Sequence, residues 1–121
     1  RPSLSLVQVL RLQEELCVAF MDADFQERLE ELEATHGKAQ EGLTSEHKQL
    51  FLTVEDAILP RYGLERGQKG VRQMLAEFDR FAENEEVCSK RSMINETLGL
   101  EPPEAAGGQE ATAAAEESGD E

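Results

Sequence analysis

The sequence predicts an all-α protein: an antiparallel, up-and-down bundle of four to five helices with a disordered acidic C-terminal tail. Apolar residues recur at helical spacing, strand-like alternation is missing, and the connectors are short and rich in turn residues. The clearest helical segment covers residues 71–82, where the apolar side chains share an arc of about 120°. They are Val71, Met74, Leu75, Phe78, Phe81 and Ala82. One apolar stripe needs partners, and the other apolar segments supply them.

The first helix is predicted to begin near Ser3 or Ser5, since Ser is a favourable N-cap. Its inward residues are Leu6, Val9, Leu10, Leu16, Cys17, Phe20 and Met21. Beyond Asp22 the apolar stripe moves by about a quarter turn. We therefore expect a kink or short break at residues 22–24, with Asp24 capping the helix that follows.

Glycines punctuate the linker at residues 35–43, and Gly37 suits a helix C-cap. Thr44 or Ser45 then caps a helix that runs to Leu59, where Pro60 stops it. The predicted inner arc of this helix is Leu50, Phe51, Val54, Ala57 and Ile58, with His47 among them.

A turn-rich connector at residues 60–70 leads into the segment at 71–82. Asn84 is the expected N-cap of a last helix, which ends at Gly99. Its inward residues are Val87, Ile94 and Leu98. Residues 1–100 are thus predicted to form the bundle, and residues 101–121 the disordered acidic tail.

The chain of 121 residues allows one domain, and its net charge of −14 argues against nucleic acid and anionic membranes as partners. Residues 101–121 hold seven acidic residues and no Lys or Arg, which is half of that charge. No apolar run is long enough for membrane insertion. With only two cysteines we expect a cytoplasmic or nuclear protein. Whether a targeting segment has been removed stays open.

Two features suggest a partner-binding surface. Leu52 and Leu59 lie opposite the inner arc of their helix, where they either form an exposed apolar spot or are covered by another helix. The connector that follows is basic in an acidic protein, with a local charge of +3 after Glu65 is subtracted. Its residues of interest are Arg61, Tyr62, Arg66 and Lys69, with Arg72 just after it, and this basic connector is taken to include Arg72. Gly67-Gln-Lys-Gly70 within it could expose backbone N–H groups to an anion, to an acidic protein partner or only to solvent.

Other constellations indicate ordinary structural roles. Asp22, Asp24, Gln26 and Glu33 follow part of a calcium-loop spacing, but Glu27 replaces the required glycine, so we interpret the stretch as a helix junction. His47 is expected to be a hydrogen-bonded core histidine, and Cys17 and Cys88 small buried hydrophobes. No cofactor, metal site or catalytic residue is predicted.

Three fragments resemble BART domains, helical modules whose family binds Arf-like small GTPases. They are Met21-Asp22-Ala-Asp24-Phe25-Gln26, Glu46-His-Lys48 with Phe51, and Met74-Leu75-x-x-Phe78-x-x-Phe81. The resemblance implies a small GTPase among the possible partners and assigns no binding residue.

The leading hypothesis is a non-catalytic protein–protein interaction or assembly module, an adaptor that contacts another protein through helix surface and the basic connector. The first alternative is a BART-like effector that binds an Arf-like small GTPase. A small acidic enzyme or metal-binding protein is the second, and self-association into a homo-oligomer is also open.

Overall fold

The computed structural model describes residues 3–100, which form an all-helical bundle. These residues contain no β-strand, and the predicted fold class is confirmed. The helices are α1 (Leu6–Phe20), α2 (Ala23–His36), α3 (Ser45–Ile58), α4 (Gly67–Asp79) and α5 (Glu85–Thr97), with short 3-10 helices η1 (Ala39–Glu41) and η2 (Leu59–Tyr62). The predicted tail at residues 101–121 lies outside the described residues. None of the helices in residues 3–100 has the length and apolar composition needed to cross a bilayer.

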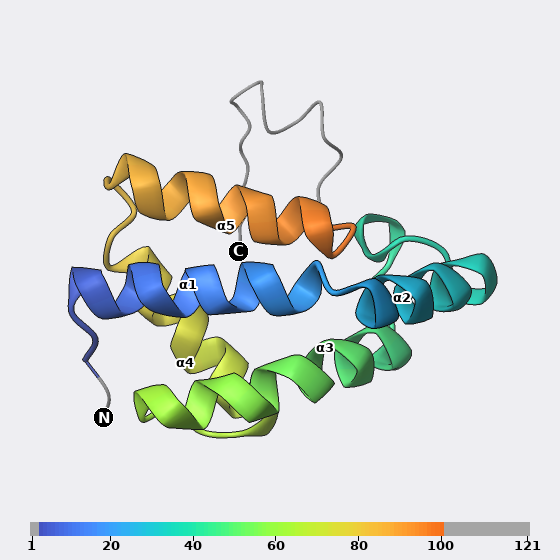
Figure 1. Ribbon diagram of the computed structural model, residues 1–121, viewed down its shortest axis with the longest axis horizontal. Coiled ribbons are helices and arrows are strands. Elements are labelled where there is room, and N and C mark those ends of the chain that lie inside the picture. The colour runs from blue at the N-terminus through green and yellow to red at the C-terminus, as the bar shows by residue number, and fades with distance from the viewer. Residues whose placement is uncertain (1–2, 101–121) are drawn as a thin grey trace.

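The central element is α1, not the predicted organising segment at residues 71–82. In Figure 1, α5 lies on one side of α1 and α3 on the other, while α2 extends beyond the end of α1. Helix α3 runs antiparallel to α1, and α4 crosses obliquely back towards the start of α1. Because α4 ends near the start of α1, α5 begins beside that end of α1 and runs in the same direction as α1. The Gln13 side chain of α1 donates a hydrogen bond to the Val87 carbonyl in the first turn of α5, which joins the two helices.

The core lies around α1. Its fully buried side chains include Val9, Leu12, Leu16 and Phe20. The Phe20 ring centroid lies 5.1 Å from that of Phe25 and 6.3 Å from that of Phe51. This aromatic cluster joins α1, α2 and α3, in the tilted and edge-on geometries that aromatic pairs prefer.

Local capping signals set the helix ends much as predicted. Ser5 caps α1 in a capping box with Gln8, and Asn84 caps α5 by accepting the Val87 N–H. Gly37 and Gly99 end α2 and α5 with φ near +80°, a backbone region that favours glycine.

The predicted break after α1 is present, with one change in detail. Asp22, rather than Asp24, caps α2 by accepting the Phe25 N–H. Gln26 then fastens the junction, because its side-chain amide donates to the carbonyls of Phe20 and Thr97 at 2.7 and 3.1 Å. The junction therefore holds the ends of α1 and α5 together.

Several predicted inward faces are rotated. Met21 and Ala57 are exposed, whereas Leu12, assigned to no face, is fully buried, because α1 is covered by both α3 and α5. On α4 the buried strip is Gly70, Met74, Glu77 and Phe78, while Leu75 and Ala82 are exposed. An oblique crossing buries a narrower strip than parallel packing does.

The cysteines differ from each other. Cys17 is buried on α1, and this burial raises the pKa of its thiol. The prediction that Cys88 is a buried hydrophobe is wrong: it lies exposed on α5, and its thiol donates to the Ala82 carbonyl.

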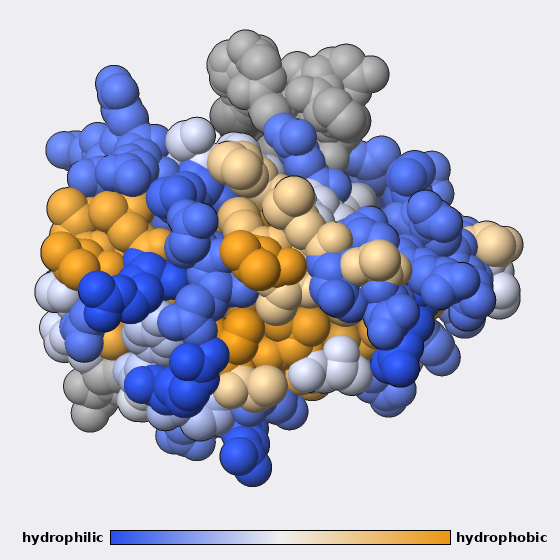
Figure 2. All heavy atoms as spheres, viewed as in Figure 1, coloured by the Kyte–Doolittle hydropathy of each residue, from blue (hydrophilic) through white to orange (hydrophobic). Residues whose placement is uncertain are grey.

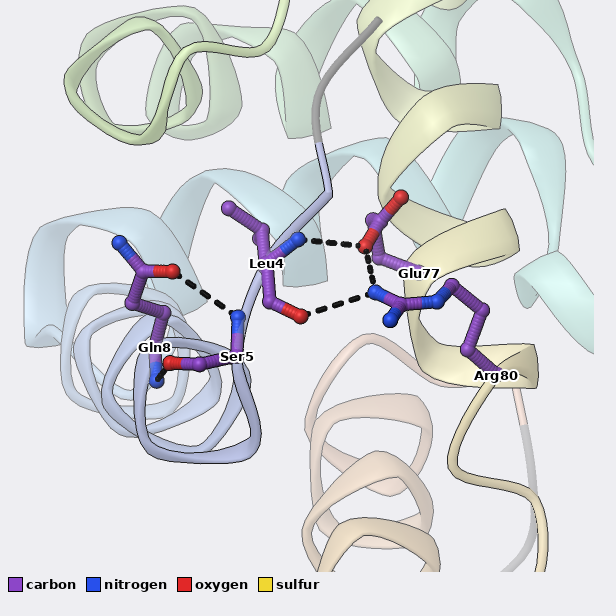
Figure 3. Close-up of polar contacts among 5 residues, drawn as sticks. All are labelled: Leu4, Ser5, Gln8, Glu77 and Arg80. Carbon is purple, nitrogen blue, oxygen red and sulfur yellow. Dashed lines mark hydrogen bonds and ion pairs between the residues drawn. The ribbon is translucent and has the colours of Figure 1, made fainter.

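A polar clamp holds the segment before α1 against α4 (Figure 3). The Leu4 N–H donates to Glu77 Oε1 at 2.9 Å, and the Leu4 carbonyl accepts from Arg80 Nη1 at 2.8 Å. Arg80 and Glu77 also form an ion pair at 2.7 Å. Because Glu77 is buried, the clamp satisfies a carboxylate that would otherwise be costly.

The start of α4 is a close backbone approach. A Cβ atom on Gly70 would lie 1.8 Å from the Glu65 carbonyl oxygen, and no flexible side chain can move to relieve that contact. Glycine is therefore required at this helical position for steric reasons.

We expect Gly70→Ala to destabilise the fold by more than about 1 kcal/mol, although Gly→Ala inside a helix is normally stabilising by about that amount. Denaturant unfolding followed by circular dichroism measures the change. Gly42→Ala is the control, since nothing lies within 4 Å of its added Cβ, and it should leave stability nearly unchanged. A stabilised Gly70→Ala protein would contradict the close approach.

We also expect Glu77→Ala to cost about 1–3 kcal/mol of unfolding free energy, because the Leu4 N–H and Arg80 both lose their acceptor. Glu83→Ala, at an exposed residue near the end of the same segment, should stay within about 0.5 kcal/mol of wild type. Equal effects of the two substitutions would show that the clamp adds nothing to stability.

Candidate functional site

The best-formed recess in residues 3–100 is an apolar cleft of about 150 Å³ between α3, α4 and α5, here termed the α3–α5 cleft. Leu16 and Phe20 of α1 also line it. Its other apolar lining residues are Leu43, Phe51, Val71, Met74, Leu75, Phe78, Ile94, Leu98 and Leu100. It therefore collects side chains from four helices and the chain segments next to them.

Two leucines remain exposed among these lining residues. Leu43, just before α3, is 45 % exposed, and Leu75 on α4 is 37 % exposed. Large apolar side chains left in water next to an apolar recess indicate a surface that another apolar group can cover.

Glu55 of α3 is the most unusual residue of the cleft. It is only 5 % exposed, yet its carboxyl group makes no ion pair or hydrogen bond with any residue in the range 3–100. Burial, with a smaller effect from the adjacent Asp56, raises the pKa of Glu55 to about 8. At neutral pH this carboxyl group is therefore mostly protonated in the free protein.

The cations of the cleft lining are not placed to neutralise Glu55. Arg91 of α5 pairs with Asp79 at 2.8 Å and stacks over the Phe78 ring. Lys48 is exposed and lies seven residues before Glu55 on α3, a rise of about 10 Å. The cleft thus offers mainly apolar walls, the two amide side chains of Gln68 and Asn95, and one buried acid that neither cation neutralises.

Sequence analysis missed Glu55, although a signal was present. His47, Phe51, Glu55 and Ile58 follow helical spacing and form the buried face of α3. An acidic residue at helical spacing among apolar residues is the sequence pattern that could have identified Glu55. Glu77 occupies the equivalent place on α4 and is satisfied by Arg80, whereas Glu55 is not.

The predicted exposed leucine pair does not exist. Leu59 is fully buried at the start of η2, and Leu52 is half-buried. The prediction of Leu59 as a partner-binding residue is therefore wrong, because η2, to which Leu59 belongs, packs against α1, α3 and α4. The alternative interpretation of a helix covered on both sides holds for Leu59.

Arg61 and Tyr62 turn towards α1. The Arg61 guanidinium pairs with the Glu15 carboxylate, and the Tyr62 hydroxyl donates to the same carboxylate. Burial and this hydrogen bond raise the pKa of Tyr62 to about 12, while the bond from Tyr62 and the charge of Arg61 lower the pKa of Glu15. Both predicted binding residues thus fasten η2 to α1.

The rest of the basic connector is partly neutralised by the fold. Lys69 pairs with Glu65 at 3.2 Å, while Arg66 and Arg72 are exposed and form no ion pair within residues 3–100. The Gly67 N–H, predicted to be available to an anion, donates to Asp56 at 2.7 Å. When Glu15 and Asp56 are counted with Glu65, the four cations leave a charge of +1 rather than +3.

His47 has the structural role that was predicted. One ring nitrogen lies 2.9 Å from the Gly37 carbonyl and the other 3.0 Å from the Thr44 N–H, so the ring joins the end of α2 to the start of α3. Among residues 3–100, no three His, Cys, Asp or Glu side chains are arranged to hold a metal ion.

A second apolar surface covers α1. Val7 and Val18 are 62 % and 65 % exposed, and shallow hollows beside Val18 contain charged residues such as Asp24 and Arg61. Figure 2 shows apolar atoms on this face, at the N-terminal end of α1 and along the junction of α1 and α3. The acids that line these hollows are exposed or half-buried, unlike Glu55, so the α3–α5 cleft is the better-defined candidate.

Comparisons of the chain with protein families, with curated protein sequences and with solved structures give no match.

The unpaired Glu55 predicts a characteristic dependence of stability on pH. Its folded-state pKa lies above the unfolded value of 4.5, so its contribution is fully present below pH 4.5 and is lost as the pH rises towards 8. We expect Glu55→Gln to remove this decline, which is at most about 1.4 kcal/mol per pH unit. Urea unfolding between pH 4.5 and 9 measures it.

Glu86→Gln, at an exposed acid in the first turn of α5, is the control and should keep the wild-type pH dependence. If Glu55→Gln and wild type lose stability in parallel over this range, the Glu55 carboxyl group is not buried and unpaired as described.

Proposed function

We propose that this chain is a non-catalytic protein-interaction module, an adaptor that receives an apolar segment of a partner protein in the α3–α5 cleft. The observation that carries the proposal is an apolar cleft with two exposed leucines among its lining residues and an unpaired acid buried inside it. An apolar segment that fills such a cleft removes the leucines from water and improves packing, and it can bring a partner to the buried acid.

The size of the cleft favours a protein partner. Pockets for cofactors and drug-sized ligands usually enclose about 300–1,000 Å³, whereas this cleft offers about 150 Å³. That volume suits one or two large side chains, the anchors through which a helix or extended segment docks into a groove.

The environment of the reactive side chains supports a non-catalytic role. Both ring nitrogens of His47 are engaged in hydrogen bonds, and the Cys88 thiol donates to a backbone carbonyl. Nucleophilic catalysis needs a nucleophile beside an oriented base, and neither residue has such a neighbour among its hydrogen-bond partners.

An Arf-like small GTPase remains the alternative partner. The residues that carry the resemblance to BART domains lie mainly inside the fold: Phe25 and Phe51 belong to the aromatic cluster, and Met74 and Phe78 are buried on α4. They support a similar core more than a similar binding surface. Arg66 and Arg72 are the cations best exposed to an acidic partner of either kind.

Site-specific photo-crosslinking tests the proposal. With a photoreactive amino acid at Leu43, we expect cellular adducts that disappear when Leu75 is changed to Asp, because the charge disrupts the same cleft. With the photoreactive group at Val18 on α1, Leu75→Asp should change nothing. Circular dichroism confirms that each variant is folded.

Two results would count against the proposal: no adduct at Leu43, or an adduct there that survives Leu75→Asp. Repeating the photo-crosslinking in a cell extract loaded with GDP or with a non-hydrolysable GTP analogue separates a GTPase partner from another protein partner. Adducts that form only with the GTP analogue support a GTPase effector, and equal adducts exclude it.

A further inference from the structure

The missing partner of Glu55 gives information about what enters the α3–α5 cleft. A buried acid without a hydrogen-bond donor is costly to the folded state, whether its proton stays or leaves. The other buried acid and the buried histidine find partners in residues 3–100: Glu77 has Arg80 and Leu4, and His47 has Thr44 and Gly37. Glu55 alone among these titratable groups faces a recess that another molecule can enter.

Residues 101–121 contain seven acids and no Lys or Arg, so they offer Glu55 no cation. The charged groups around Glu55 are Asp56 and Lys48 on α3 and Arg91 on α5, with Asp79 bound to Arg91. The stretches of α1 and α4 that line the cleft add no charge. With ionised Glu55 these five groups sum to −1.

We propose that the partner segment carries a lysine whose ammonium group pairs with the Glu55 carboxylate inside the α3–α5 cleft. This inference rests on the proposed function and identifies the chemistry of the partner. It gives a role to the acid on the buried face of α3, beside Phe51 and Ile58.

Lysine fits the cleft better than the other donors. Its stem of four methylenes can lie against walls such as Met74 and Ile94 while its compact ammonium reaches the acid. A guanidinium is broader and planar, and it prefers bidentate contact with an open carboxylate. Lys48 lines the cleft, is exposed and forms no ion pair within residues 3–100, so it suits an acid that flanks the lysine in the partner.

Binding in this way is linked to a proton. In the free protein Glu55 is mostly protonated below its pKa of about 8, so at such pH pairing with an ammonium releases that proton to solvent and leaves a carboxylate. Affinity should therefore rise about tenfold per pH unit below pH 8 and then level off. The lysine itself stays charged throughout, because its usual pKa is about 10.4.

The chemistry can be tested with small probes. We expect n-hexylammonium to bind wild-type protein at pH 8.5 at least about tenfold more tightly than 1-hexanol, which has the same stem without the charge. Nuclear magnetic resonance titration should place the shifts at Phe51, Leu75 and Ile94. In Glu55→Gln the two probes should bind alike, and in Glu86→Gln the preference should persist.

Equal affinity of the two probes in wild-type protein would overturn the inference, as would a preference that does not fall towards pH 6. A stronger response to hexanoate than to hexylammonium would overturn it too, since an anion would then be the preferred occupant.

A zero-length carbodiimide crosslinker identifies the source of the ammonium group, because it joins a carboxylate to an amine. We expect mass spectrometry to find an amide between Glu55 and a lysine of another protein, lost in Glu55→Gln. A Glu55 product with a free amine, or with Lys from a second copy of this chain, would contradict the partner lysine.

The two proposals fail in different ways. Photo-crosslinking at Leu43 does not depend on Glu55. Adducts at Leu43 without an ammonium preference would therefore support the interaction module and contradict only the proposal of a partner lysine. An ammonium preference without any protein adduct would remove the interaction module instead.

Discussion

Helix α1 is enclosed by α3 on one side and α5 on the other, and its inward side chains, such as Leu12 and Leu16, have no contact with water. This enclosure constrains everything else in the bundle. The two flanking helices are separated by the width of α1, so the chain between them has to cross that distance. Helix α4 does so obliquely, and an oblique helix cannot fill the whole space between α3 and α5. The cleft is therefore a consequence of how α1 is covered.

The helix ends were largely predictable because their signals are local. Ser5, Gly37, Asn84 and Gly99 act at the ends of the helices to which the sequence assigns them. Each signal depends on residues within one turn, and no distant contact is needed to interpret it.

The faces were less predictable because they depend on how helices cross. Leu59 lies opposite the expected inner arc but is buried because η2 packs against α1, α3 and α4, and Leu75 lies within an expected stripe but is exposed beside the cleft. From the sequence, Arg61 was expected to be free to bind a partner, but in the fold it pairs with Glu15, which is 46 residues away in the sequence. Local patterns cannot contain such contacts, which explains why most of the proposed site was not found from sequence.

The buried polar groups differ in whether their hydrogen-bonding atoms have partners. His47 joins α2 to α3 with both ring nitrogens engaged, and Gln13 joins α1 to α5 through one of its two polar atoms. Such groups add little net stability but favour one arrangement of the helices over others. The Glu55 carboxyl group makes no such bond within residues 3–100, so its position in the core is easier to understand through recognition than through folding.

The clamp at Leu4 has an evolutionary consequence. Its hydrogen bonds use the peptide N–H and carbonyl of residue 4, groups that do not depend on which side chain is attached. Natural substitution at that position can therefore exchange one apolar residue for another without disturbing the bonds, and only proline removes the donor. The clamp therefore constrains Glu77 and Arg80 by side-chain chemistry, while at position 4 it constrains only the backbone, and burial alone requires that side chain to be apolar.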